Sequence, residues 1–307
     1  MFFSLDKIKN KDVGVVDHKG PPLVFILASP RTGSTFLYQL LINIYNFGYI
    51  NNLINDKFNR SLATGFAVTK LAGGFSKKVA YDSFYGKTNR WYEPSEGSMV
   101  FYNWYGGDHP SEIYSANAKN PSDMTASISR AYSVMNRPII FKNAWNCFRI
   151  RDLSYRYPNS FFIWLRRDII SSVASDLESR YSRGSPYVWN SATTKNYEEL
   201  FGLQPHEQSV EQQYWFNDSI GKNLNLYAKN RYCEVWYEDI CNDVDGEVSR
   251  IEISVNKVWS NRLIRKDNID VNCLKTSSLI EDKEVIDYVC KEKDRFRDFI
   301  KNEKFKS

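Results

Sequence analysis

The chain has 307 residues, of which 42% are hydrophobic and 25% are charged, and its formal net charge is +5 at pH 7. Such a composition is ordinary for a globular protein that buries one full core, so division into two domains is not required. The mild positive charge suits small polyanionic ligands. Because the chain has no basic arm or dense basic block, we expect no nucleic-acid partner.

Residues 1–20 read as a polar N-terminal arm that is charged too early for a secretory signal. No apolar run approaches the ~20 residues that a bilayer-spanning helix needs. The five cysteines are scattered and odd in number, which is typical of thiols in a reducing compartment. We therefore expect a cytoplasmic protein without a membrane span. The three histidines are far apart in sequence, so we expect no metal.

An apolar run at residues 23–28 predicts a buried strand, and the loop that follows it is rich in hydroxyl groups. Residues 29–37 read Ser-Pro-Arg-Thr-Gly-Ser-Thr-Phe-Leu. A strand, a short loop and a helix opening at Ser34 present backbone N–H groups and a positive helix end to an anion. Gly33 permits the tight turn, and Ser34 and Thr35 add hydroxyl donors. The G-x-x-x-x-G-K-[ST] pattern of magnesium-dependent nucleotide triphosphatases is missing, so the expected anion is not ATP with magnesium.

An ordinary strand-to-helix turn, capped by Ser34 or Thr35, is the alternative interpretation of this loop. It accounts for the hydroxyl residues but not for Arg31, whose charge would oppose the positive end of the helix. A bound anion shared by Arg31 and the helix end would remove that conflict. The functional interpretation is therefore the one we favour.

Strands and helices alternate over the middle of the chain. We expect a strand at 139–142 that ends at Lys142, a helix through Leu153, and a second strand at 161–165. After that strand come Arg166, Arg167 and an amphipathic helix, on which Ser175 lies eight residues beyond Arg167. Open α/β sheets bind ligands at the carboxyl ends of their strands, where Arg167 lies. Arg166 suits a neighbouring ion pair.

The remaining segments complete an α/β pattern. Residues 46–130 read as irregular with short helices, and residues 181–206 as a long loop or lid. A helix near 207–229 and a strand at 233–237 follow. We interpret Tyr237-Glu238-Asp239 as a helix start, and the alternating charges of 291–304 as a solvated helix. The alternation predicts one α/β domain with a central parallel sheet flanked by helices.

The loop motif resembles one in the sulfotransferase family that uses 3′-phosphoadenosine 5′-phosphosulfate (PAPS), and its residues are Pro30-Arg31-Thr32-Gly33-Ser34-Thr35. That resemblance implies that residues 21–307 form a sulfotransferase domain, with acceptor-site insertions around 46–130 and 181–206. It implies that the loop, from Arg31 to Thr35, holds the 5′-phosphosulfate. It also implies that Arg167 and Ser175 hold the 3′-phosphate. Lys142 matches the strand-end lysine that approaches the transferring group, so Lys142 and Arg31 are implied to stabilise charge, with no metal required.

The chain departs from the animal cytosolic enzymes of this family at the general base. Their catalytic histidine lies two residues beyond the lysine, where this chain has Ala144. Some relatives use a glutamate, so Glu96 is our first choice for the base, Glu93 the second and His109 a distant third. Nearby aromatic residues could desolvate a carboxylate, line an acceptor pocket or simply form core: Tyr81, Phe84, Tyr85, Phe101, Tyr102, Trp104 and Tyr105. A helix that begins at Pro94 is the alternative explanation of Glu96.

The expected reaction is in-line transfer of a sulfuryl group from PAPS to a hydroxyl, or an amine, of a small-molecule or carbohydrate acceptor. The product of the donor would be adenosine 3′,5′-diphosphate (PAP). Two alternatives stay open: a P-loop kinase or NTPase without its lysine signature, and a non-catalytic relative that binds a nucleotide or glycan. Sequence leaves the acceptor, the oligomeric state and the conformation of 181–206 undetermined.

Overall fold

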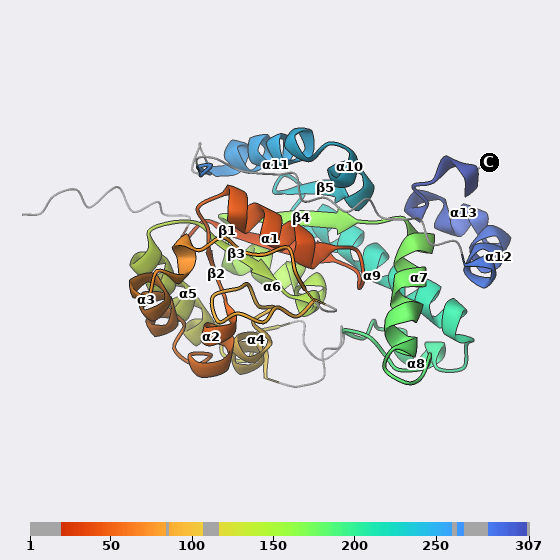
Figure 1. Ribbon diagram of the computed structural model, residues 1–307, viewed down its shortest axis with the longest axis horizontal. Coiled ribbons are helices and arrows are strands. Elements are labelled where there is room, and N and C mark those ends of the chain that lie inside the picture. The colour runs from red at the N-terminus through yellow and green to blue at the C-terminus, as the bar shows by residue number, and fades with distance from the viewer. Residues whose placement is uncertain (1–19, 84–85, 107–116, 260–262, 267–281, 306–307) are drawn as a thin grey trace, which may run out of the picture.

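The computed structural model describes residues 20–83, 86–106, 117–259, 263–266 and 282–305, and nearly all of the predicted N-terminal arm (1–20) lies outside them (Figure 1). Within the described chain the strands form one sheet in the order β2-β3-β1-β4-β5, and every neighbouring pair is parallel. The strands are β1 (Leu23–Ala28), β2 (Gly48–Tyr49), β3 (Ile139–Lys142), β4 (Ser160–Arg166) and β5 (Tyr232–Trp236). The predicted α/β class with a central parallel sheet is confirmed.

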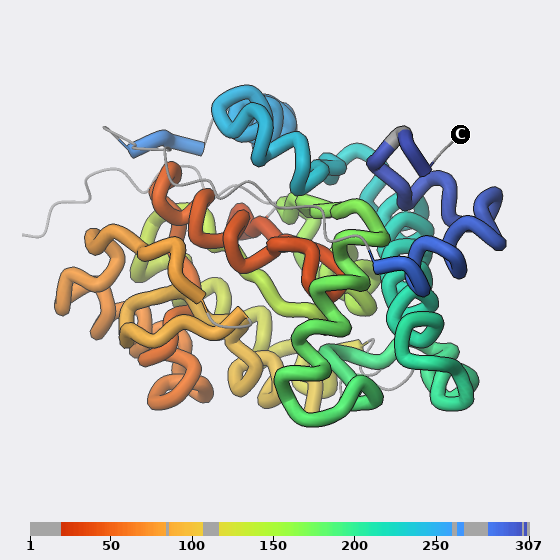
Figure 2. Tube along the Cα trace, turned by 45° about the vertical axis from the view of Figure 1, so that its right-hand side comes forward, coloured from red at the N-terminus to blue at the C-terminus, as the bar shows by residue number. Residues whose placement is uncertain are grey.

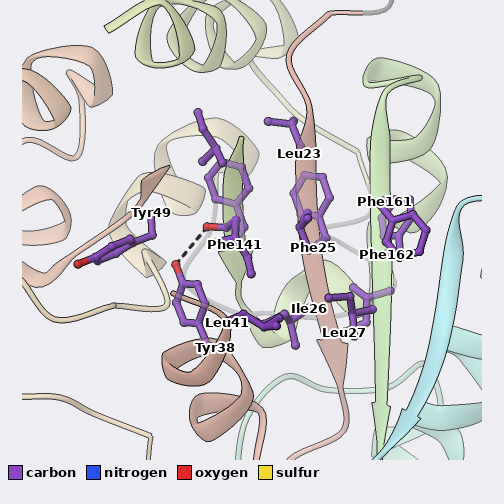
Figure 3. Close-up of a cluster of buried hydrophobic side chains, with 14 of the residues drawn as sticks. Leu23, Phe25, Ile26, Leu27, Tyr38, Leu41, Tyr49, Phe141, Phe161 and Phe162 are labelled. Atoms are coloured by element: carbon purple, nitrogen blue, oxygen red, sulfur yellow. Dashed lines mark hydrogen bonds between the residues drawn. The ribbon is translucent and has the colours of Figure 1, made fainter. Parts of the chain in front are cut away.

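The centre of the sheet is apolar because it is covered on both faces. All six residues of β1 are buried. Phe25 lies in register with Phe141 on β3 and Phe162 on β4. Its ring stacks on both neighbours, with centroid distances of 5.3 and 5.5 Å (Figure 3). Close packing of this kind fixes where the strands end, and so fixes the loops that leave their carboxyl ends.

Helices flank the sheet: α1 packs on β1 and β3, α9 on β1, and α11 on β4 and β5 (Figure 1). No helix in the described part of the chain combines the length and the apolar character that crossing a bilayer requires. The helices are α1 (Ser34–Ile44), α2 (Asn52–Lys57), α3 (Leu62–Leu71), α4 (Ser98–Tyr105), α5 (Pro121–Met135), α6 (Ile150–Arg156), α7 (Ile169–Tyr181), α8 (Tyr197–Leu200), α9 (Pro205–Tyr227), α10 (Tyr237–Asn242), α11 (Val244–Trp259), α12 (Lys283–Lys291) and α13 (Lys293–Phe296), with 3₁₀ turns at η1 (Gly74–Ser76), η2 (Ala144–Phe148), η3 (Arg297–Phe299) and η4 (Glu303–Phe305).

The region 46–130 is more regular than its sequence predicted. It contributes the edge strand β2, and its helices α3 and α5 pack against each other. A two-residue strand is too short to show periodicity, and α5 is rich in serine and alanine rather than in large apolar residues, so neither gave a clear signal. The helix expected after Lys142 is interrupted as well. A 3₁₀ turn, η2, precedes α6, and Asn143 caps it by accepting the Trp145 N–H at 2.9 Å.

The C-terminal residues form a second small core instead of the solvated helix that their charges predicted. Figures 1 and 2 place α12 and α13 beside α7 and α9. Phe296 and Ile300 are buried there, together with Val173 of α7 and Val210 of α9. Charged residues cover the outside of these short helices, which explains why the sequence pattern was misleading.

Candidate active site

The loop between β1 and α1 ends on a glycine that no other residue could replace without rearrangement. Gly33 is the N-cap of α1 and has φ +85°. A Cβ at this position would lie 2.5 Å from the ring of Tyr237. Because α1 begins at Ser34 and carries no side-chain cap, the interpretation of Ser34 or Thr35 as an N-cap is wrong. The uncapped start of this 11-residue helix favours a bound anion.

Arg31 brings this loop onto helix α7. Its guanidinium Nε and Nη2 donate to Ser175 Oγ at 3.3 and 3.2 Å. The residue adopts φ +65°, in the left-handed region that costs a non-glycine residue roughly 1–2 kcal/mol. Strain of this kind collects at functional sites. Two residues that are 144 positions apart in sequence are therefore in direct contact.

Arg167, at the carboxyl end of β4, completes what we call the arginine cluster (Arg31, Arg167, Ser175). Its Nη1 donates to the Arg31 carbonyl oxygen at 3.0 Å, and its guanidinium lies 4.9 Å from the centre of the Tyr237 ring. Its Nε is buried and has no hydrogen-bond partner among the described residues. A buried guanidinium N–H with no protein acceptor is suited to an anionic ligand.

The neighbouring Arg166 has a structural role and lies outside the arginine cluster. It forms the expected ion pair, with Glu234 of β5 at 2.6 Å, and also donates to the carbonyl oxygen of Asp298. Its guanidinium lies 4.3 Å from the centre of the Trp236 ring. These contacts use Arg166 to join β4, β5 and the C-terminal segment, which leaves Arg167 to face the loop.

The segment after β5 closes the arginine cluster from one side. As expected, a helix (α10) starts at Tyr237 with acidic residues in its first turn. Sequence reasoning missed that the Tyr237 ring supports both Gly33 and Arg167. Burial raises the pKa of Tyr237 to about 12, so the phenol stays protonated. Burial also raises the pKa of Glu238, which accepts the Asp168 N–H at 3.0 Å.

A second group, which we call the lysine cluster (Thr35, Glu96, Lys142), lies where β3 ends. Lys142 is 8% exposed, and its Nζ donates to Thr35 Oγ1 at 3.2 Å. The same ammonium group forms an ion pair with the carboxylate of Glu96. The structure therefore brings together the strand-end lysine, the first turn of α1 and the carboxylate that sequence reasoning placed first.

Glu96 is held by its backbone, whereas its side chain stays about a third exposed (35%). Its carbonyl oxygen accepts the side-chain N–H of Asn143 at 3.0 Å, and the preceding Ser95 N–H bonds to the carbonyl of Ile50 at 2.9 Å. Helix α4 begins only at Ser98, so a helix that starts at Pro94 is not the explanation of Glu96.

Glu93 is buried instead, with 2% of its surface exposed. Its carboxylate accepts the backbone N–H groups of Asn89 and Arg90 at 3.2 and 3.1 Å, and the Arg90 guanidinium at 3.0 Å. These bonds shape the turn that precedes Glu96. The role of Glu93 as a base is untested and stays a prediction, while His109 lies outside the described residues.

Most of the aromatic residues around Glu96 have a packing role. Phe101, Trp104 and Tyr105 are buried in the main core, whereas Tyr102 is 39% exposed. Tyr81 packs against Phe36, with ring centres 5.6 Å apart. Phe84 and Tyr85 lie outside the described residues.

Helix α9 supports the loop between β1 and α1 through side-chain hydrogen bonds that no sequence motif predicted. Gln213 Nε2 donates to the Pro30 carbonyl at 2.7 Å, and Asn217 Nδ2 to Ser29 Oγ at 3.2 Å. The hydroxyl of Thr32 bonds back to the Ser29 carbonyl at 2.9 Å, within the loop itself. The Thr32 hydroxyl therefore shapes the loop, whereas the predicted hydroxyl donor Thr35 belongs to the lysine cluster. Among described side chains, no three His, Cys, Asp or Glu residues gather as metal ligands.

The sequence profile of the sulfotransferase family matches residues 22–256. Among solved structures, the chain is similar to a sulfotransferase from Mycobacterium avium (12% identity, 78% of this chain and 67% of that one, TM-score 0.48). It is also similar to sulfotransferases from Mycobacterium tuberculosis H37Rv (14% identity, 80% and 72% covered, TM-score 0.47) and Alicyclobacillus acidocaldarius (10% identity, 94% and 99% covered, TM-score 0.43). No curated protein matches the sequence.

Proposed function

Because the chain belongs to the sulfotransferase family, it is an enzyme of sulfuryl transfer, and we propose that its donor is PAPS. We further propose that the acceptor is a hydroxyl, or an amine, of a small molecule or carbohydrate, and that the reaction takes place in the cytoplasm. The free thiols of Cys147, Cys233, Cys241 and Cys290 agree with a reducing compartment.

The observation that carries this proposal is the contact between Arg31 and Ser175, with Arg167 bonded to the same loop. Two guanidinium groups and a hydroxyl meet beside an uncapped helix N-terminus, which is a strong environment for phosphate. The unpartnered Nε of Arg167 fits a phosphate oxygen. Arg167 and Ser175 would hold the 3′-phosphate of PAPS, and the loop from Arg31 to Thr35 would hold its 5′-phosphosulfate.

The lysine cluster supports the proposed transfer of the sulfuryl group. PAPS supplies a sulfuryl group that is already activated, so the protein has to position it and stabilise charge. Lys142 would neutralise charge that develops on the sulfuryl oxygens, with Thr35 Oγ1 beside it. Glu96 would accept the proton of the acceptor hydroxyl as the new bond forms. Since the Lys142 ammonium group now pairs with Glu96, a bound sulfuryl group would take over part of that contact.

Transfer of radioactive sulfate from labelled PAPS to a pool of hydroxyl and amine acceptors tests the proposal directly. We expect labelled product in a buffer that contains EDTA, because positioning and charge stabilisation need no magnesium. ATP turnover that depends on magnesium, without sulfate transfer, would instead establish a kinase or NTPase. PAP binding without transfer to any acceptor would indicate a non-catalytic relative.

A further inference from the structure

A second glycine, Gly86, lies at the lysine cluster. It comes from the same irregular segment as Glu96, and it has φ +85°. A Cβ built on it would lie 3.3 Å from Thr35 Oγ1, 3.8 Å from Glu96 Oε1 and 4.0 Å from Lys142 Nζ. The missing side chain of Gly86 therefore points at all three members of the cluster at once.

One point in space is thus within reach of a hydroxyl, a carboxylate and an ammonium group. Reacting atoms require such a point, because the proton acceptor and the charge-stabilising cation must both be near them. Gly86 borders this point through its backbone alone. Any larger residue would place its own carbon atom where a reacting oxygen has to come.

We infer that Gly86 is the residue that keeps the space for the acceptor oxygen open, and so determines which acceptors can react. The inference rests on the proposed function. Its chemical content is that the oxygen of a hydroxyl group approaches Glu96 and Lys142 past the bare backbone of Gly86. A side chain at this position closes that approach, and the arginine cluster stays intact.

The matched controls are two other glycines that also have a positive φ and at which an added Cβ would meet no other atom within 4 Å. Gly73 has φ +70° and Gly184 has φ +96°, and a Cβ on either would meet nothing within 4 Å. Alanine at any of these three positions introduces the same kind of backbone strain. Only at Gly86 does it also fill the space beside the lysine cluster.

The experiment follows the reverse reaction with 4-nitrophenyl sulfate and PAP. The bond between sulfur and the phenolic oxygen breaks, a bond between sulfur and a 5′-phosphate oxygen of PAP forms, and coloured 4-nitrophenolate leaves with the electron pair. We expect Gly86→Ala to lower kcat/KM for 4-nitrophenyl sulfate by about tenfold or more, as one methylene in a tight site can. Gly86→Val should lower it further. PAP affinity, measured by calorimetry, should stay close to wild type in both variants.

Gly73→Ala and Gly184→Ala should keep both the exchange rate and the PAP affinity. Full exchange activity in Gly86→Ala would overturn the inference and leave the proposed function standing. Parallel loss of PAP affinity and exchange in Gly86→Ala would also overturn it, because Gly86 would then belong to donor binding. A wild-type protein that neither binds PAP nor exchanges sulfate would contradict the proposed function itself.

Discussion

The arginine cluster and the lysine cluster are built in different ways. Arg31 and Arg167 leave the carboxyl ends of β1 and β4, which are neighbours in the sheet, and Ser175 follows on the helix after β4. In the lysine cluster, Lys142 also ends a strand, but Glu96 comes from an irregular segment held by a few hydrogen bonds. The fold itself therefore places the anion-binding groups, whereas the proposed base depends on local contacts.

This difference suggests that donor binding and transfer can be separated by mutation. Changes at Arg167 and Ser175 of the arginine cluster should act on affinity for PAP. Changes in the lysine cluster, or in the contacts that hold Glu96, should act on the rate of transfer. Three of the four predictions below test that separation, and the fourth concerns the stability of the segment beside the arginine cluster. They run from the largest expected effect to the smallest.

Glu96→Gln should have the largest effect. The amide keeps the shape of the side chain but cannot accept a proton, so transfer should fall by about 10²–10⁴-fold, the usual contribution of general base catalysis. PAP affinity should stay near wild type. Glu93→Gln is the matched control, since its carboxylate is bonded within its own turn. Glu93→Gln should lower the melting temperature and leave the transfer rate close to wild type. An inactive Glu93→Gln beside an active Glu96→Gln would assign the base to Glu93.

Arg167→Ala should weaken PAP binding by about 1.5–3 kcal/mol, the range for hydrogen bonds to charged groups, or roughly ten- to hundredfold in Kd. Arg167→Lys keeps the charge but loses the planar guanidinium group, so its Kd for PAP should lie between those of wild type and Arg167→Ala. Saturating donor should restore most of the transfer rate in both variants. If the rate stays low at saturation, Arg167 acts on the chemical step and the separation fails.

Asn143→Ser should have a smaller effect, on rate alone. The shorter hydroxyl can still cap the Trp145 N–H but cannot reach the Glu96 carbonyl, which Asn143 now holds at 3.0 Å. Loss of one such bond is worth about 0.5–1.5 kcal/mol, so transfer should slow by about two- to tenfold at unchanged PAP affinity. Equal losses of rate and affinity would show that Asn143 supports the whole site rather than Glu96.

Glu238→Gln should have the smallest effect, on stability. Burial raises the pKa of Glu238 in the folded protein, so the folded state holds this proton more tightly than the unfolded state does. The contribution of Glu238 to stability therefore falls as the pH rises from its pKa in the unfolded state to its higher pKa in the folded state. The neutral amide, which can still accept the Asp168 N–H, should raise the melting temperature at pH 7 relative to wild type, and the gain should shrink as the pH is lowered. A difference that does not depend on pH would contradict this account.

The strand ends that carry Arg31 and Arg167 could be predicted from the sequence, whereas the donor-binding role of these residues stays a prediction. The apolar runs before Arg31 and Arg167 located the strand ends, and parallel neighbours bring such ends together. Contacts made by single side chains carried no such signal. The support of Gly33 by Tyr237, the brace from Gln213 and the position of Gly86 became visible only in three dimensions. The short strand β2 and the buried C-terminal helices were missed for a related reason, because brief elements show little periodicity.

Calorimetric titration with PAP and with adenosine 5′-monophosphate, both in EDTA, tests the central claim most directly. The two ligands differ by the 3′-phosphate that Arg167 and Ser175 are proposed to hold. We predict that wild type binds PAP at least about tenfold more tightly than the monophosphate, the value of one charge-assisted hydrogen bond, and that Arg167→Ala loses this preference. Equal affinity of wild type for the two ligands would contradict the assignment of the arginine cluster and, with it, the proposed donor.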